Sequence, residues 1–185
     1  MLTKHFSNPY KDFPVYTYEN FLMPTEEEFD HTHKYSLRTY AVLEKTLDKM
    51  NRGYNWPIKP YGYIGKLSNK FNKVLSECIG EKVDQPLVHV YVSNKYQYFD
   101  LWHTHTHTTA SLTAVYYFCI DENTSSIEFE KDGNIIEHFP KQNELVMFPH
   151  DMNHRPTKKG LSEDHRITFA FDRIFTPQDR LKDIW

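Results

Sequence analysis

A series of short apolar runs fills the second half of the chain and limits the folds that it can adopt. From residue 85 onward, β-branched and aromatic residues recur in stretches of strand length, and turn-rich pieces such as "DENTSS" and "KDGN" separate them. The runs read "PLVHVYVS", "YQYFDLWHTH", "SLTAVYYFCI", "SIEFE", "NIIEHFP", "ELVMFP" and "RITFAFD". Short strands at this spacing are typical of a β-sandwich or a barrel.

The first half of the chain predicts helices instead. Residues 25–50 open with a threonine cap and three glutamates, which suit the positive end of a helix dipole. Apolar residues then recur at helical spacing as Phe29, Tyr40, Leu43 and Leu47. We expect one amphipathic helix here, or two in succession.

A second helix is predicted over residues 66–80, where "KLSNKFNKVLSECIG" ends at a glycine. The preceding stretch "YNWPIKPYGYIG" is rich in proline, glycine and aromatic residues, and we expect a loop that caps the core or lines a groove for a peptide. The sequence therefore predicts one domain over residues 1–185 of the mainly β, α+β class, with helical support in residues 1–80 and a β core in residues 85–175.

Charge and cysteine content exclude several classes of function. Lys and Arg number 22 against 25 Asp and Glu, a net charge of −3, and neither sign forms a long run, so we expect no nucleic-acid partner. The two cysteines match no metal or redox motif, which indicates a reducing compartment. With no apolar signal core and no run of transmembrane length, we expect a cytoplasmic protein without a membrane partner.

The stretch "WHTHTHT", residues 102–108, places a histidine at every second position. In a strand, alternate side chains point to one face, so His103, His105 and His107 share a face, and two of them can chelate one metal ion. Because the residues alternate, either His103 with His105 or His105 with His107 can form the chelating pair on stereochemical grounds. Asp100 is the nearest upstream carboxylate and can become a ligand only if the strand bulges.

Further candidates lie downstream, in "NELVMFPHDMNHRP" and "RITFAFD". The first predicts a strand followed by a loop that carries His150 and His154. The second predicts a strand whose alternation puts Arg166, Thr168 and Ala170 on one face. An arginine on an inward face needs an anion, and its guanidinium fits a carboxylate bidentately.

In this order, the segments "HTHTTASLTAVYYF", "NELVMFPHDMNH" and "RITFAFD" resemble the 2-oxoglutarate/Fe(II)-dependent dioxygenase superfamily. They look like its small phage and marine bacterial members, whose pattern is H-x-H, then S-G-V-Y-Y, later F-P, a distal histidine and R-I-S. The resemblance covers roughly residues 86–174. It implies a double-stranded β-helix, the jelly-roll or cupin-like core of these enzymes.

The resemblance also implies roles for individual residues. His105 and His154 would ligate iron(II), Arg166 would bind the distal carboxylate of the cosubstrate 2-oxoglutarate, and Thr168 would be the hydroxyl that accompanies this arginine. Most of the superfamily carries Asp or Glu two residues after the proximal histidine, but this chain has His107 there. The expected metal ligands are therefore His105, His107 and His154, with His103 as the alternative in register.

The implied function is hydroxylation of an unidentified substrate, a protein or peptide side chain or a small molecule, with formation of succinate and CO2. Ascorbate is an optional reductant. Two other classes stay open: a three-histidine, cupin-like metal dioxygenase independent of 2-oxoglutarate, which has no need of Arg166, and a non-enzymatic jelly-roll binding or structural module, which needs neither iron nor His154.

Four tyrosines are candidates to bind the cosubstrate, namely Tyr91, Tyr98, Tyr116 and Tyr117. Tyr116 and Tyr117 are adjacent, so a strand would point them to opposite faces. Spacing alone does not choose between them.

Overall fold

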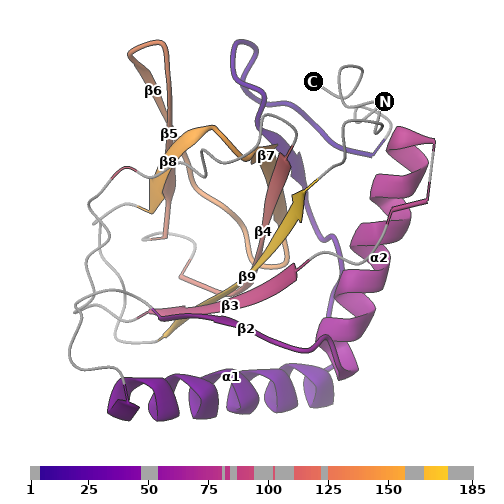
Figure 1. Ribbon diagram of the computed structural model, residues 1–185, viewed down its shortest axis with the longest axis vertical. Coiled ribbons are helices and arrows are strands. Elements are labelled where there is room, and N and C mark those ends of the chain that lie inside the picture. Colours follow the sequence, from indigo (N-terminus) through magenta and orange to yellow (C-terminus); the bar gives the residue numbers. More distant parts are fainter. Residues whose placement is uncertain are drawn as a thin grey trace.

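A computed structural model of the chain consists of two facing β-sheets, with two helices against the larger sheet (Figure 1). It describes residues 5–46, 54–80, 82–83, 87–93, 102, 111–121, 125–156 and 165–174. His103, His105 and His107, together with Asp100 and Tyr98, lie outside the described residues. No helix in the described part is long and apolar enough to cross a membrane.

The larger sheet runs in the order β1, β7, β4, β9, β3, β2, and every pairing in it is antiparallel. Its strands are β1 (Tyr16–Tyr18), β7 (Leu145–Pro149), β4 (Ser111–Cys119), β9 (Arg166–Ile174), β3 (Leu87–Ser93) and β2 (Tyr54–Pro57). The smaller sheet has the order β6, β5, β8, and its strands are β6 (Asn134–His138), β5 (Ile127–Lys131) and β8 (Asn153–Pro156).

The helices α1 (Glu26–Thr46) and α2 (Gly62–Ile79) cover the outer face of the larger sheet. The apolar stripe of α2 packs on alternate residues of β3, β4 and β9, with the rings of Phe71 and Phe171 stacked at 5.1 Å between centroids. Burial of each such side chain stabilises the fold by roughly 1.5–3 kcal/mol. This packing holds the central strands in place from behind.

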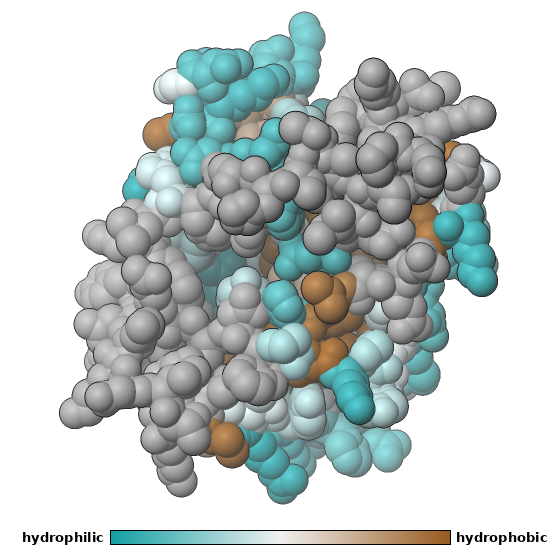
Figure 2. Space-filling model, in the orientation of Figure 1, coloured by the Kyte–Doolittle hydropathy of each residue, from teal (hydrophilic) through white to brown (hydrophobic). Residues whose placement is uncertain are grey.

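The opposite face of the larger sheet points toward the smaller sheet. A second apolar cluster fills the space between them, with Tyr117 and Phe148 from the larger sheet and Ile127 and Phe129 from the smaller one. From outside, hydrophobic side chains are visible near the centre of the face in Figure 2, whereas hydrophilic ones occupy much of its periphery. The inner faces of the two sheets therefore form the interior of a jelly roll.

Most sequence-based expectations for the elements are confirmed. Thr25 and Glu28 form a reciprocal capping box at the start of α1, because the Glu28 amide donates to Thr25 Oγ1 and the Thr25 amide donates to the Glu28 carboxylate. The helix α2 ends at Gly80, which has a left-handed φ of 81°. The strands β3 to β7 and β9 fall within or close to the predicted runs, while the run "YQYFDLWHTH" lies outside the described residues except for Trp102.

Two expectations need correction. Residues 54–65 are not all loop, because residues 54–57 form the edge strand β2 and α2 begins at Gly62, four residues before the predicted start. Ile58 and Tyr63 are buried in the core on the helix side rather than over the interior. His154 does not lie in a loop either: it belongs to β8, a four-residue strand that ends at Pro156 and lacks apolar alternation.

Candidate active site

His154 points into the interior from the edge strand of the smaller sheet. Its side chain is buried, and its ring lies 4.7 Å from that of Phe148 between centroids. Nδ1 is 2.7 Å from the carbonyl oxygen of Met152, and since a carbonyl only accepts hydrogen bonds, Nδ1 carries the proton. In the neutral imidazole, Nε2 then bears the lone pair. A second hydrogen bond that fixes the tautomer in this way is typical of metal-ligating histidines.

Arg166 opens β9 on the same inner face, as the alternation of the sequence predicted. Its guanidinium carbon lies 5.4 Å from the ring centroid of Tyr117 on the neighbouring strand β4. Within the described residues, neither Arg166 Nε nor the Tyr117 hydroxyl has a hydrogen-bond partner, although both atoms are buried. Burial lowers the pKa of Arg166, and it raises that of Tyr117 to about 12 against the opposing effect of the arginine charge.

Two buried donors side by side, with no partner among the described residues beyond each other, carry a free-energy cost of a few kcal/mol unless a ligand satisfies them. A carboxylate is the fitting partner, because it accepts hydrogen bonds from both groups and neutralises the guanidinium. Thr168 lies two residues beyond Arg166 on the same face and is paired with both Tyr117 and Tyr91. The arrangement is therefore chemically suited to an anionic group.

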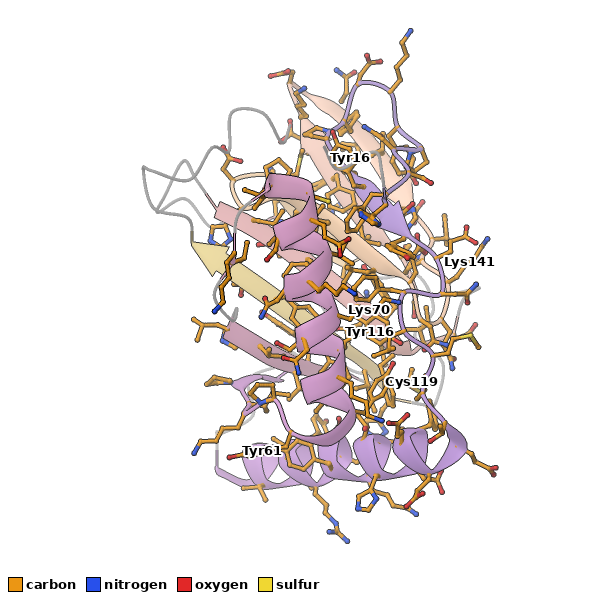
Figure 3. All side chains as sticks on the ribbon, turned by 90° about the vertical axis from the view of Figure 1, so that its right-hand side faces the viewer. Tyr16, Tyr61, Lys70, Tyr116, Cys119 and Lys141 are labelled. Carbon is orange, nitrogen blue, oxygen red and sulfur yellow. The ribbon has the colours of Figure 1, made fainter. Side chains whose placement is uncertain are left out.

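Tyr116 has a different role. It faces the helices, where its single hydroxyl proton can go to the Leu22 carbonyl or to Asn143 Oδ1, 2.7 Å away, and its oxygen lies 2.7 Å from the hydroxyl of Tyr63. Figure 3 shows it beneath α2, near Lys70. The structure thus selects Tyr117 over Tyr116 as a tyrosine of the interior.

The histidine run lies outside the described residues, but Trp102, which precedes it, is described. Trp102 packs against Arg155 of β8, with 4.4 Å between the guanidinium carbon and the ring centroid, and Arg155 directly follows His154. Within the described residues, no group of three or more His, Cys, Asp or Glu side chains is arranged to hold a metal ion. Of the expected ligands His105, His107 and His154, the structure describes only His154.

Sequence reasoning missed a polar cluster at the other end of β9. Asp172 Oδ1 accepts a hydrogen bond from Thr113 Oγ1 at 3.1 Å, and the same hydroxyl lies 2.8 Å from Nδ1 of His150. His89 approaches the second oxygen, with 3.5 Å between Nδ1 and Oδ2. These residues come from four different segments of the chain, so only the strand pairing brings them together.

No protein-family model matches the sequence, and no curated protein sequence matches it significantly. Solved structures do match the fold. A prolyl hydroxylase from Trichoplax adhaerens, in complex with a peptide fragment of the hypoxia inducible factor oxygen degradation domain, is 13% identical, with a TM-score of 0.66 over 92% of this chain and 87% of that chain. A prolyl-4-hydroxylase from Pseudomonas putida is 12% identical, with a TM-score of 0.61 over 88% and 94%.

HygX from Streptomyces hygroscopicus, solved with nickel and 2-oxoglutarate bound, is 10% identical, with a TM-score of 0.61 over 86% of this chain and 82% of that chain. At such identities the likeness shows the fold. It confirms the double-stranded β-helix expected from the sequence, and it agrees with the two antiparallel sheets described above.

Proposed function

We propose that the protein is an Fe(II)- and 2-oxoglutarate-dependent dioxygenase that hydroxylates a C–H bond of its substrate. The observation that carries the proposal is the pair of buried, unpaired donors on Arg166 and Tyr117, which face the same interior as His154. The fold likeness to HygX with nickel and 2-oxoglutarate bound supports the same assignment.

The spacing of the interior suits 2-oxoglutarate. Thr113 is paired with both Asp172 and Phe148, and the ring of Phe148 packs on His154, so His154 lies near the level of Asp172. Thr168 and Asp172 are four residues apart on β9, roughly 13 Å at ~3.3 Å per residue. A five-carbon dicarboxylate spans about 5 Å between its end carbons, which leaves about 4 Å at each end, enough for one hydrogen bond or metal contact.

For the metal, we propose His105, His107 and His154 as ligands, with His103 as the alternative. Arg155 forms an ion pair with Glu128, its partner on β5, on the side of β8 opposite to His154. Trp102 packs on that same side. Alternate residues of an extended segment share a face, which is the reason to propose His105 and His107 as a pair.

When bound, iron(II) with 2-oxoglutarate supplies the oxidant that hydroxylates a C–H bond, with succinate and CO2 as coproducts. The residues of this chain provide the geometry. Arg166 and Tyr117 hold the far carboxylate, His154 presents Nε2, and Phe129 and Phe148 exclude water beside it. We further propose that residues 1–80 support the core, within a single domain.

The substrate class stays open between a peptide and a small molecule. Among the structures with this fold, one holds a peptide fragment and another holds hygromycin B together with nickel and 2-oxoglutarate. Neither identity transfers to this chain at 10–13% sequence identity.

Uncoupled turnover tests the proposal without knowledge of the substrate. Purified protein with iron(II), ascorbate and 2-oxoglutarate should form succinate, Arg166→Ala should not, and Arg38→Ala, a change on the exposed face of α1, should behave as the parent does. Oxygen uptake that is independent of 2-oxoglutarate would support the three-histidine dioxygenase instead. A protein that binds neither iron nor 2-oxoglutarate would be a non-enzymatic module.

A further inference from the structure

On the inner face of β9, Arg166 and the Asp172 cluster occupy opposite ends. Arg166 opens the strand, Thr168 and Ala170 follow on the same face, and Asp172 lies six residues from Arg166, roughly 20 Å along a strand. The five-carbon cosubstrate of the proposed function fills only part of this length. Asp172 therefore lies beyond it, at the level of His154, where a substrate would have to approach.

The hydrogen bonds around Asp172 leave the carboxylate with unused capacity. The Thr113 hydroxyl has one proton and donates it to Asp172 Oδ1, so His150 Nδ1 must donate to Thr113. Oδ2 has only the His89 nitrogen near it, at 3.5 Å, and His89 Nδ1 has no hydrogen-bond partner within the described residues. An ionised carboxylate accepts about four hydrogen bonds, so positions for a ligand remain.

Charge points to the nature of this ligand. Among the residues that the structure describes, the basic side chains beside Asp172 are His89 and His150, each charged only when protonated, and no lysine or arginine pairs with it. The Asp172 side chain is 17% exposed, and those of His89 and His150 are 21% and 14% exposed, so solvent and small groups reach the cluster. A half-buried carboxylate without a fixed cationic partner attracts a cation.

We propose that Asp172, oriented by Thr113 and flanked by His89 and His150, recognises a protonated amine on the substrate. That the amine belongs to a substrate rests on the proposed dioxygenase function. The amine site itself depends only on the residues around Asp172. The amine can belong to a small molecule or to a lysine side chain in a peptide, because both present the same ammonium group.

Two pairs of probes separate these sources. Cadaverine is compared with the neutral 1,5-pentanediol, and the tripeptide acetyl-Gly-Lys-Gly-amide is compared with its norleucine counterpart. Binding is measured by calorimetry on the full chain, once without metal and once with iron(II) and 2-oxoglutarate under nitrogen. In air, the effect of each probe on 2-oxoglutarate consumption is measured.

The variant Asp172→Asn keeps the size and an acceptor for Thr113 but removes the charge. Asp132→Asn, at the exposed turn between β5 and β6, is the matched control. We expect at least one amine to bind the parent, its neutral counterpart to bind more weakly, and Asp172→Asn to weaken amine binding at least tenfold, with Asp132→Asn unchanged. The amine that binds should also accelerate 2-oxoglutarate consumption in the parent and not in Asp172→Asn.

Several results would overturn the assignment: no binding of either amine, equal binding by Asp172→Asn and the parent, or loss of iron(II) binding in Asp172→Asn, which would make Asp172 a metal ligand. The calorimetry without metal tests the amine site independently of the proposed dioxygenase function. If the parent fails to bind 2-oxoglutarate but binds an amine through Asp172, the dioxygenase function fails and the amine site stands.

Discussion

Tyr116 and Tyr117 are neighbours in β4 whose hydroxyls lie on opposite faces of the larger sheet. The Tyr116 hydroxyl is hydrogen-bonded to Leu22 and Asn143 on the helix side, whereas that of Tyr117 is buried beside Arg166 without a partner within the described residues. Both rings are fully buried, so the two tyrosines differ in hydrogen bonding rather than in packing. One phenol stabilises the fold, and the other is available to a ligand.

Removal of the Tyr117 hydroxyl should therefore affect ligand binding, whereas removal of the Tyr116 hydroxyl should affect stability. Tyr117→Phe should raise the dissociation constant of 2-oxoglutarate about tenfold, the worth of one charged hydrogen bond of roughly 1.5 kcal/mol, with little loss of stability. Tyr116→Phe should leave this constant unchanged and reduce the free energy of unfolding by about 1–3 kcal/mol, because Asn143 loses a buried partner. Anaerobic titration of the iron(II)-loaded protein with 2-oxoglutarate measures the dissociation constant, and urea denaturation measures the free energy of unfolding. A reversal of the pattern would contradict the proposed site.

Alkaline pH should destabilise the protein through Tyr117. Burial raises the pKa of its hydroxyl to about 12, whereas tyrosines of an unfolded chain titrate near 10. Between these values the folded state binds more protons than the unfolded state, so the free energy of unfolding falls as the pH rises through this window. The contribution of Tyr117 is about 1–3 kcal/mol. Urea denaturation from pH 9 to 11 should show a weaker pH dependence for Tyr117→Phe; an unchanged dependence would refute the prediction.

The sequence predicted those parts of the fold whose periodicity is local. The alternation of β9 placed Arg166 and Thr168 on one face and Phe169 and Phe171 on the other, as observed. Strands as short as β1 and β8 have too few residues for alternation to be recognised. Their pairing with distant strands, β7 and β5, stabilises them.

The residues of the candidate site were likewise predictable only where the sequence pattern around them is local. The inward position of Arg166 was predictable because a charged residue inside an alternating apolar strand is conspicuous. The Asp172 cluster was not, because Thr113, His150 and His89 are individually unremarkable and meet only through the register of β3, β4 and β9. The choice of Tyr117 likewise required the packing of the helices, since these define which face of β4 is the outer one.

Replacement of the proposed metal ligands should separate them from the nearby histidines. His105→Ala, His107→Ala and His154→Ala should each abolish stoichiometric iron(II) binding while the fold is kept, because a site with three ligands rarely survives the loss of one. His103→Ala should have little effect, and His31→Ala, an exposed change on α1, serves as a control. Metal analysis of protein purified without a histidine tag measures the outcome. If His103→Ala loses the metal and His107→Ala keeps it, the pair His103 and His105 is the chelate.

The most discriminating prediction concerns Arg166, because only 2-oxoglutarate chemistry requires it. Lysine at this position keeps the positive charge but loses the planar fork that binds both oxygens of a carboxylate. Such a contact contributes about 1.5–3 kcal/mol, so Arg166→Lys should weaken 2-oxoglutarate binding tenfold to a hundredfold, and Arg166→Ala should weaken it further. Iron(II) occupancy should barely change in either variant, since His154 enters the interior from the other sheet.

Anaerobic titration of the iron(II)-loaded variants with 2-oxoglutarate gives the dissociation constants, and metal analysis of the same samples gives the occupancy. Because Arg166 packs against the buried ring of Tyr117, the variants should also be checked for an unchanged urea midpoint, so that a loss of binding is not a loss of fold. Binding of 2-oxoglutarate by Arg166→Ala with the affinity of the parent would mean that the buried donors serve some other anion, and the dioxygenase assignment would then have to be abandoned.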